Sequence, residues 1–558
     1  MELKVLAVLY LFVAVDAQVL VEKTEHVLEW EHYHTRNHLQ QKLKKNAYTE
    51  EETHSEFWLD SAQNKLRDKL AQKKSVTKAK NVIFFIGDGM SPQTVAATRA
   101  YLGNENESLS FEKFPHLGQA KTYCVNRQVP DSACTGTSYL SGVKVNYGML
   151  NVVASIARYT CDYEKNNSTE LDGLMKWAQD AGKATGIVTN TRITHATPAA
   201  SYAKSATRGW EYDAAVVDDG CDPEKSIDIA RQMVYNEVPK NFKVILGGGR
   251  RNFRPTDVRD EEGSSGYRTD GRDLIDEWST VHEDMGTAAY VWNRTGLVEL
   301  DLNNTDYLLG LFESNHMKYN LRVEEEDAAS VEPTLSEMVE AAIKILRKSE
   351  NGYVLFVEGG LIDLAHHETR ARLALDETAE YSKAVNLARE LTDEGDTLIV
   401  VSSDHSHTMT YNGYTKRGQD VLGIADISER DGLPYTTLSY ANGPGYTDTY
   451  TDGNPAERID ITNIDYTQIN QRYLATAPLS SEAHGGEDVT VYASGPFAHI
   501  FNGNYEQNTL PHLIAYAVSI GEYYDEQVEP PVDEDGGATS LSICLALLLA
   551  AVVATVAR

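Results

Sequence analysis

Short apolar runs alternate with amphipathic helical segments along most of this chain, and this alternation limits the fold more than any other feature. Buried strands are expected at Asn81–Ile86, Thr185–Thr189, Val244–Leu246, Tyr353–Val357, Thr397–Val401 and Val489–Ala493. Helices are expected at Ser91–Leu102, Leu171–Ala181, Ile227–Tyr235, Leu335–Lys348 and Arg370–Leu391. Because strands separated by helices usually pair in parallel, the sequence predicts an α/β protein with a central, mostly parallel sheet flanked by helices.

The composition indicates a large globular protein with an acidic surface. The chain has 558 residues, of which 41% are hydrophobic, so it can bury a sizeable core in one elaborated domain or two. Its 83 acidic residues outnumber its 51 lysines and arginines, which gives a formal charge of −32. Such a surface repels the phosphate backbone of nucleic acids. We therefore expect no nucleic-acid partner, and an extracellular or luminal location.

Two segments depart from the α/β pattern. Residues 18–80 are rich in charge, with a helical period from Phe57 to Leu70, and are expected to form an N-terminal arm and helix. Residues 408–483 are rich in Tyr, Gly, Asn and Thr and lack a helical period, which predicts an insertion. The α/β core is then expected at residues 81–407 and 484–525.

Both ends of the chain resemble targeting signals. Residues 1–17 combine an early lysine, an apolar run and small residues at the end, which is the pattern of a secretory signal peptide. Residues 526–558 form an acidic spacer and an apolar tail, which predict a glycosylphosphatidylinositol (GPI) anchor on the outer face of the plasma membrane. A peptide anchor is the alternative, although an apolar tail of about 17 residues is short for a bilayer. The candidate attachment residues are Asp535, Gly536 and Gly537.

Secretion changes what the cysteines and asparagines imply. Four cysteines remain once the tail is removed, and four cysteines allow three pairings, among which the sequence does not choose. They are Cys124, Cys134, Cys161 and Cys221. Five asparagines begin Asn-x-Ser/Thr sequons, so glycosylation is expected, with one glycan shared by the overlapping pair. They are Asn106, Asn166, Asn167, Asn293 and Asn303.

Acids and histidines follow several of the expected strands. Sites in open α/β sheets lie beyond the carboxyl ends of the strands, and carboxylates and imidazoles are ligands for Zn²⁺ and Mg²⁺. Ser132 in VPDSACTGT is a candidate nucleophile. Together these residues predict metal-assisted group transfer. The acids and histidines are Asp88, His195, Glu358, Asp363, His367, Asp404, His405 and His407.

Each residue has a simpler explanation when it is considered alone. Asp88 could be a turn residue, Ser132 could be a helix N-cap, and Arg208 could be a surface charge. Asp363 and His367 could belong to a solvated helix face, yet their spacing of four puts them on one side, as chelation requires. The prediction of a site depends on the expected meeting of all these residues at one edge of the sheet.

Six motifs, in their order along the chain, resemble those of the alkaline phosphatases. They are NVIFFIGDGMS, VPDSACTGTSYLSGVK, TRITHATPAA, LFVEGGLIDLAHH, SSDHSHT and HGGED. The resemblance extends from about Phe57 to Tyr523 and is greatest to the animal, membrane-bound members. It implies a sheet between helices with a crown insertion, a homodimer, and hydrolysis of phosphate monoesters with two Zn²⁺ and one Mg²⁺.

The same resemblance implies a role for each residue of the site, with Ser132 as the nucleophile and Arg208 as the residue that binds the phosphate. Further sets would hold the metal ions or orient their ligands. The Zn²⁺ ligands would be Asp363, His367 and His484 for one ion, and Asp88, Asp404 and His405 for the other. The Mg²⁺ ligands would be Asp88, Thr197 and Glu358. The orienting residues would be Asp131, His195 and His407.

The resemblance further implies a structural Ca²⁺ and a disulfide bond between Cys161 and Cys221, whereas Cys124 and Cys134 have no counterpart. The Ca²⁺ ligands would be Glu262, Phe312, Glu313 and Glu332; alternatively, these segments are only a strand end and a helix start.

The chain also departs from the family pattern at two positions beside the metal ligands. Leu361 and Leu364 stand where an Arg and a His are usual, which affects the expected substrate preference and rate. Two other functions remain open: a sulfatase or phosphodiesterase of the same superfamily, and a catalytically silent surface receptor. The complete set of expected ligands disfavours the receptor, and the expected Mg²⁺ site favours monoesters.

Overall fold

The computed structural model describes residues 48–524 except 104, 326–330 and 454. The predicted signal peptide and the predicted anchor signal lie outside the described residues. None of the described helices is both long and apolar enough to cross a membrane.

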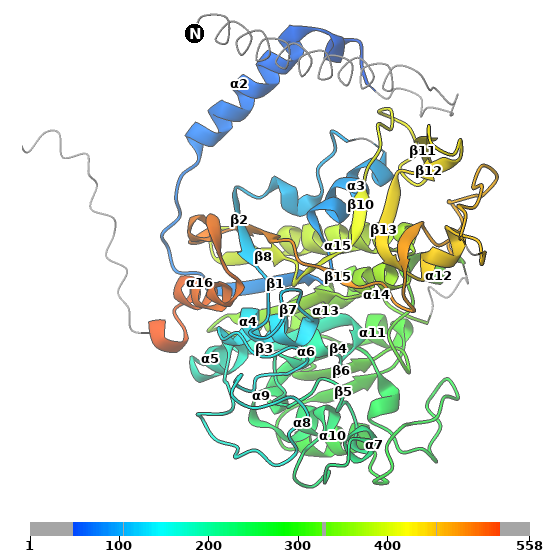
Figure 1. Cartoon of the computed structure of the whole chain (residues 1–558). Helices are drawn as coiled ribbons and strands as arrows, with labels where there is room; N and C mark the ends of the chain where they lie inside the picture. The colour runs from blue at the N-terminus through cyan, green and yellow to red at the C-terminus, as the bar shows by residue number, and fades with distance from the viewer. Residues whose placement is uncertain (1–47, 104, 326–330, 454, 525–558) are drawn as a thin grey trace, which may run out of the picture.

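Ten strands among the described residues form the central sheet (Figure 1). They are β1 (Asn81–Gly87), β2 (His116–Lys121), β3 (Ala184–Arg192), β4 (Phe242–Gly248), β5 (Ala288–Val291), β6 (Tyr307–Leu311), β7 (Tyr353–Gly359), β8 (Thr397–Ser402), β16 (Val489–Ser494) and β17 (Gly503–Glu506). Their order across the sheet is β17-β2-β16-β8-β1-β7-β3-β4-β6-β5.

The sheet is mostly parallel, as the alternating sequence pattern predicts. Every neighbouring pair from β8 to β5 is parallel. The exception is β16, which runs antiparallel to both β8 and β2. The strand predicted at Val489–Ala493 therefore exists, but with the opposite direction to its neighbour β8.

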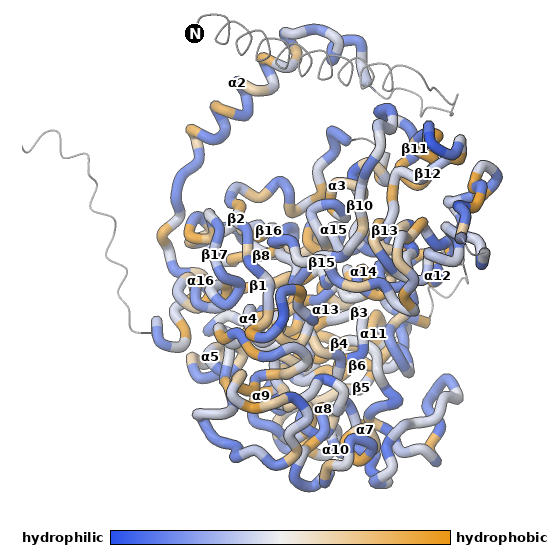
Figure 2. Tube along the Cα trace, viewed as in Figure 1, coloured by the Kyte–Doolittle hydropathy of each residue, from blue (hydrophilic) through white to orange (hydrophobic). Residues whose placement is uncertain are grey.

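Helices cover both faces of the sheet, because the central strands are apolar on both sides. In β1, Ile83 and Phe85 pack with one set of helices, and Val82 and Phe84 pack with the other. The first set is α3 (Pro92–Leu102), α13 (Leu335–Leu346) and α15 (Ala371–Leu391). The second set is α4 (Ser132–Ser141), α5 (Leu174–Asp180), α8 (Ile229–Tyr235), α10 (Leu274–His282) and α16 (Leu510–Val518). Figure 2 shows the apolar residues gathered along the inner strands.

Shorter helices lie in the connections. They are α6 (Ala196–Ala199), α7 (Asp213–Asp218), α9 (Glu237–Lys240), α11 (Arg294–Glu299), α12 (Asn320–Glu325) and α14 (Leu361–His367).

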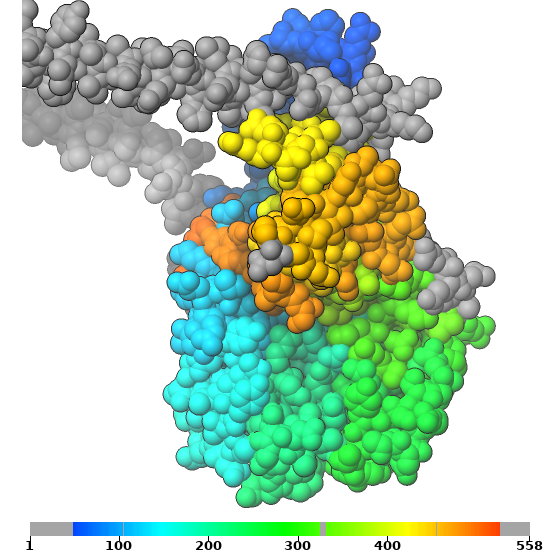
Figure 3. All heavy atoms as spheres, turned by 45° about the vertical axis from the view of Figure 1, so that its right-hand side comes forward, coloured from blue at the N-terminus to red at the C-terminus, as the bar shows by residue number. Residues whose placement is uncertain are grey.

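Residues 408–483 form small sheets and contain no α-helix among their described members. One sheet is made of β10 (Met409–Tyr411), β13 (Leu438–Gly443) and β14 (Ala475–Pro478), and β11 (Ile424–Ile427) pairs with β12 (Pro434–Thr436). Their apolar side chains pack against α3 and α15. In Figure 3 this yellow and orange segment projects above the cyan and green body. The segment leaves and returns through β9 (Ser406–His407) and β15 (His484–Gly485), which pair with each other.

Helix α2 (Ser55–Ala71) contains no buried residue, and it extends away from the body in Figure 1. It agrees with the helix predicted from Phe57 to Leu70.

Candidate active site

Three acids meet at the carboxyl ends of neighbouring strands. Asp88 follows β1, Glu358 lies near the end of β7, and Asp404 follows β8. These strands are adjacent in the order β8-β1-β7, so the three carboxylates converge at one edge of the sheet. All three side chains are fully buried. The structure therefore brings these three acids together, as the sequence predicted.

The first candidate metal group joins Asp363, His367 and His484, with His407 beside them. The Nε2 atoms of His367 and His484 lie 3.1 Å apart. The Nδ1 atom of His367 donates to the carbonyl of Glu482 at 2.5 Å, and that of His484 donates to the carbonyl of Pro130 at 2.8 Å. With Nδ1 of each ring donating to a carbonyl, the two Nε2 atoms are left facing each other, as the ligands of one metal ion do. The residues fit a metal ion.

The second group centres on His405, whose Nε2 faces three oxygens. It lies 3.1 Å from Asp404 Oδ2, 3.4 Å from Asp88 Oδ1 and 3.3 Å from Ser132 Oγ. Asp88 Oδ1 is buried and has no hydrogen-bond partner in the structure. Because buried polar atoms are normally satisfied, this oxygen indicates a missing ligand. The ring of His405 also stacks on that of His484, with centroids 3.6 Å apart, so the two groups adjoin.

The third group joins Asp88, Glu358 and His195. Thr197 Oγ1 donates to Asp88 Oδ2 at 3.3 Å, so Thr197 also lies here. Glu358 Oε2 accepts from the hydroxyl of Thr191 at 2.9 Å, while its Oε1 is buried without a partner. Oxygen atoms of this kind fit Mg²⁺ better than Zn²⁺.

Crowding of buried carboxylates shifts their pKa values. Burial raises the pKa of Asp88 well above its ordinary range, and the nearby charges of Asp363, Asp404 and Glu358 raise it further. Burial likewise raises the pKa of Glu358 to about 7. Acids that are ionised in such a place need cations next to them, so the electrostatics agree with the geometry.

Ser132 is the first residue of α4, and Asp131 is the N-cap. Asp131 Oδ1 accepts from the backbone N–H of Cys134 at 3.3 Å and of Gly148 at 2.8 Å. The interpretation of Ser132 as a helix cap is therefore wrong, because the preceding carboxylate already fills that role. The Ser132 hydroxyl is left at the positive end of the α4 dipole, where an anion is stabilised.

Arg208 lies between Asp131 and His195. Its Nη1 donates to Asp131 Oδ2 at 3.0 Å, and its Nη2 lies 3.0 Å from Nε2 of His195. Burial lowers the pKa of His195 well below its ordinary range, and the charge of Arg208 lowers it further. A neutral His195 can accept from Arg208, so both neighbours orient the guanidinium fork.

Glu482 is a residue of the site that was not predicted from the sequence. Its carboxylate accepts from His407 Nδ1 at 2.5 Å and from the backbone N–H of Thr408 at 2.7 Å. Burial lowers the pKa of His407, but the charges of Glu482 and Asp363 outweigh burial and raise the pKa to about 10. His407 therefore donates from both nitrogens and orients Asp363, which its Nε2 contacts at 2.6 Å. Its place in the sequence, two residues before the expected ligand His484, could have indicated this role.

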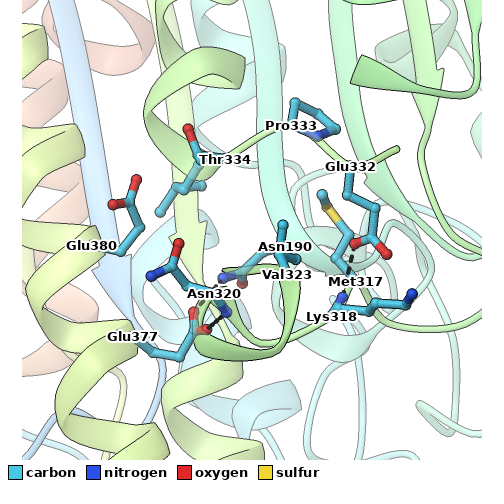
Figure 4. Close-up of a pocket in the computed structure, with 11 residues that line it drawn as sticks. Asn190, Met317, Lys318, Asn320, Val323, Glu332, Pro333, Thr334, Glu377 and Glu380 are labelled. Carbon is cyan, nitrogen blue, oxygen red and sulfur yellow. Dashed lines mark hydrogen bonds between the residues drawn. The ribbon is translucent and has the colours of Figure 1, made fainter. Parts of the chain in front are cut away.

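The proposed Ca²⁺ ligands are less closely gathered. Glu262 pairs with the buried Arg250, and Glu313 Oε1 accepts from the backbone N–H of Ser314 at 2.6 Å. Within the described part of the chain, Glu262, Glu313 and Glu332 do not form a group whose ligand atoms all lie within 4.8 Å. Glu332, labelled in Figure 4, has one buried oxygen without a partner. Burial and the nearby acids raise the pKa of Glu332 to about 8.

The four cysteines form two disulfide bonds, Cys161–Cys221 and Cys124–Cys134. The first is the pair that the family resemblance implies, and the second resolves the pair that it left unassigned. The Cys124–Cys134 bond closes a short loop that contains Pro130, Asp131 and Ser132.

The two unusual leucines both lie in α14, beside the expected metal ligands Asp363 and His367. Leu361 is fully buried and Leu364 is partly buried.

The predicted glycosylation sites differ in exposure. Asn106, Asn167 and Asn303 are exposed, whereas Asn166 and Asn293 are partly buried. The side-chain oxygen of Asn166 accepts from Ser168 N at 2.8 Å, and that of Asn293 from Gly296 N at 2.7 Å.

Comparisons with known proteins agree with this geometry. The family model for alkaline phosphatase matches residues 79–520. The chain is 45% identical over 481 residues to a membrane-bound alkaline phosphatase of Bombyx mori, covering 84% of this chain and 86% of the relative. It is 43% identical over 496 residues to the tissue-nonspecific alkaline phosphatase isozyme of Homo sapiens, covering 86% of this chain and 91% of the relative.

Solved structures agree on the fold. The crystal structure of Thermus thermophilus alkaline phosphatase matches with a TM-score of 0.57 and 23% identity, covering 80% of this chain and 93% of that one. Since the family model spans most of the chain and relatives above 40% identity cover more than four-fifths of it, this chain belongs to the alkaline phosphatase family.

Proposed function

We propose that this enzyme hydrolyses phosphate monoesters through a phosphoserine formed on Ser132. The observation that carries the proposal is the position of the Ser132 hydroxyl, 3.3 Å from Nε2 of His405 and at the start of α4, beside three groups of side chains that could hold metal ions. A serine hydroxyl is a weak nucleophile unless a neighbouring charge activates it.

The donor atoms support two Zn²⁺ and one Mg²⁺. One Zn²⁺ would be held by Asp363, His367 and His484, the other by Asp88, Asp404 and His405, and the Mg²⁺ by Asp88, Thr197 and Glu358. When bound, these ions supply the positive charge that activates the serine hydroxyl and stabilises the departing oxygen.

The chain's own groups position the reaction. Arg208, oriented by Asp131 and His195, can bind two phosphoryl oxygens with its remaining N–H groups. Ser132 Oγ then bonds to phosphorus while the ester oxygen departs as the alcohol. Water next attacks the phosphoserine from the vacated side, which breaks the Ser132 Oγ–phosphorus bond, releases phosphate and restores the hydroxyl.

Trapping the intermediate tests this proposal. Brief incubation with labelled phosphate at acidic pH should leave label on the peptide VPDSACTGT, because hydroxide is scarce there and hydrolysis of the phosphoserine slows. Ser132→Ala should lose the label and most of the activity, whereas Ser138→Ala, on the same helix, should keep both. Label on another residue, or full activity of Ser132→Ala, would contradict a covalent route through Ser132.

We also propose that the enzyme is anchored by GPI at the cell surface. The acidic spacer and apolar tail support the anchor, and the name of the Bombyx mori relative agrees with membrane attachment. Phosphatidylinositol-specific phospholipase should release active enzyme from membranes, and truncation before Ala538 should secrete it. Retention after the lipase treatment would favour a peptide anchor.

We also propose that the enzyme is a homodimer, and the exposed apolar side chains of α2 support this. Trp58 is 49% exposed and Leu70 is 77% exposed, on a helix with no buried residue. Apolar side chains on an isolated helix gain stability from a partner surface. Light scattering of the secreted enzyme should give twice the monomer mass, and a monomer would contradict the proposal.

One Ca²⁺ is proposed near Glu332, supported by its unpartnered buried oxygen. Glu332→Gln should lower the Ca²⁺ content measured by metal analysis and the calcium-dependent gain in melting temperature, and unchanged values would reject the site.

A further inference from the structure

Helix α14 carries two proposed Zn²⁺ ligands but lacks a capping side chain of its own. Its seven residues, Leu361–His367, include Asp363 near the start and His367 at the end, and its N-cap residue is Gly360. The first N–H groups of a helix have no partner within the helix. A buried helix start therefore requires acceptors from elsewhere in the protein.

Asn190, in the central strand β3, supplies those acceptors. Its Oδ1 accepts from the backbone N–H of Gly360 at 2.7 Å and from that of Leu361 at 3.2 Å. The Asn190 side chain is buried, with 6% of its surface exposed. One amide oxygen thus caps the helix from a strand far away in the sequence.

The other end of the same amide is bound to the buried carboxyl group of Glu377. Asn190 Nδ2 donates to Glu377 Oε2 at 3.1 Å, and Glu377 Oε1 accepts from the backbone N–H of Asn320 at 2.6 Å. Figure 4 shows Asn190, Asn320 and Glu377 together beside a small cavity of about 30 Å³. With N–H donors on one side and an accepting carboxyl oxygen of Glu377 on the other, only one orientation of the amide satisfies both.

We propose that the Asn190–Glu377 pair positions α14 and therefore Asp363 and His367, an inference that rests on the proposed function of these two residues as Zn²⁺ ligands. A helix of two turns moves as a unit, so a change at its N-terminus displaces both ligands. Glu377 fixes the amide to α15 and, through Asn320, to the start of α12. Asn190 is thus a positioning residue that touches neither substrate nor metal.

Four variants of the full-length holoenzyme test the pair: Asn190→Ala, Asn190→Asp, Glu377→Gln, and the double variant Asn190→Asp with Glu377→Gln. Asn190→Ala removes the cap. Asn190→Asp places two carboxyl groups face to face. Glu377→Gln sets an amide N–H group either against the N–H groups of Asn190 or against the backbone N–H of Asn320. The double variant restores one donor and one acceptor with the polarity of the pair reversed, while an oxygen still faces Gly360 and Leu361.

The primary measurement is the rate at which zinc passes from each enzyme to a chromogenic chelator. Partners that orient metal ligands typically contribute ~10–100-fold to metal affinity, and we expect zinc release to accelerate by that order in Asn190→Ala. Both other single variants should also release zinc faster, and the double variant should return toward the wild-type rate. Turnover should fall in parallel, whereas inhibition by phosphate should change little because Arg208 is not on α14.

The outcomes separate this inference from the proposed function. His484→Ala serves as the reference, because it removes a proposed ligand directly. If His484→Ala keeps all its zinc, the proposed ligand set fails. If His484→Ala loses zinc while Asn190→Ala retains it at the wild-type rate, positioning by Asn190 is wrong. If the double variant releases zinc as fast as the product of the single effects predicts, the two residues do not act as a pair. The rescue keeps the test decisive even where one single variant folds poorly.

Discussion

His407 and His484 face each other across the two-residue strands β9 and β15, so the segment 408–483 begins and ends beside a proposed metal group. Glu482 lies next to this junction: its carboxylate accepts from His407 in β9, and its carbonyl accepts from His367 in α14. The position of the histidines thus depends on how the inserted segment closes.

Glu482→Gln should lower activity by ~10–100-fold, as expected for a residue that orients metal ligands. The charge of Glu482 helps to raise the pKa of His407 to about 10, so its loss should lower that pKa and weaken the contact with Asp363. Steady-state kinetics and zinc content check this. Glu457→Gln, an exposed acid in the same segment, should match wild type. Equal kinetics of Glu482→Gln and wild type would remove Glu482 from the site.

Arg208→Ala should raise KM and weaken inhibition by phosphate, with a smaller fall in kcat. A hydrogen bond to a charged group contributes about 1.5–3 kcal/mol, so KM should rise by roughly 10–100-fold. Arg208→Lys should be intermediate, because lysine keeps the charge but loses the planar fork. If phosphate inhibits Arg208→Ala as strongly as wild type, Arg208 does not bind the phosphate.

The proposed metal ligands should differ in how strictly activity requires them. His484→Ala and His405→Ala should abolish turnover, because both proposed Zn²⁺ ions would act directly on the reacting oxygens. Thr197→Ala should keep measurable activity, restored in part by excess Mg²⁺, since its hydroxyl is a neutral donor beside two acids. Turnover measured across a series of Mg²⁺ concentrations checks the difference. Near-normal rates in His484→Ala would show that the ligand assignment is wrong.

Removal of the Cys124–Cys134 bond should weaken substrate binding more than removal of the Cys161–Cys221 bond, although it should destabilise the fold less. The loop-entropy relation predicts a loss of about 3 kcal/mol for this loop and about 4 kcal/mol for the longer Cys161–Cys221 loop. Only the first loop holds Asp131, which orients Arg208.

Serine substitution at both Cys124 and Cys134 should therefore raise KM and weaken phosphate inhibition. The matched Cys161/Cys221 variant should be less stable but closer to wild type in KM. Chemical denaturation and steady-state kinetics give both quantities, and the opposite order of KM effects would contradict this role of the short loop.

Glu377 should make stability depend on pH. Burial raises its pKa to about 8 in the folded protein, against an ordinary value of 4.5. The contribution of its protonated form is therefore fully present below pH 4.5 and is lost as pH rises through 8. Between pH 5 and pH 9 the free energy of unfolding of wild type should fall by ~2–5 kcal/mol relative to Glu377→Gln. Denaturant titrations at several pH values measure this, and parallel pH profiles would contradict it.

The sequence predicted the central strands because they are buried on both faces and form continuous apolar runs. Four strands toward the two edges of the sheet, β2, β17, β5 and β6, were not predicted. They are only four to six residues long, and β2, β5 and β17 have no continuous buried run. The direction of a strand depends on how the chain connects it to its neighbours. The residues Val489–Ala493 therefore gave no sign that β16 runs antiparallel to β8.

The sequence by itself also determined the chemical character of the site, because residue type and position at strand ends are local properties. Which atoms meet depended on the tertiary structure. Asn190 and Glu377 are 187 positions apart, and Glu482 approaches His367 only after the segment 408–483 has folded back. Hydrogen bonds of this kind form between groups that the sheet order and helix packing bring together, and no periodicity along the chain records them.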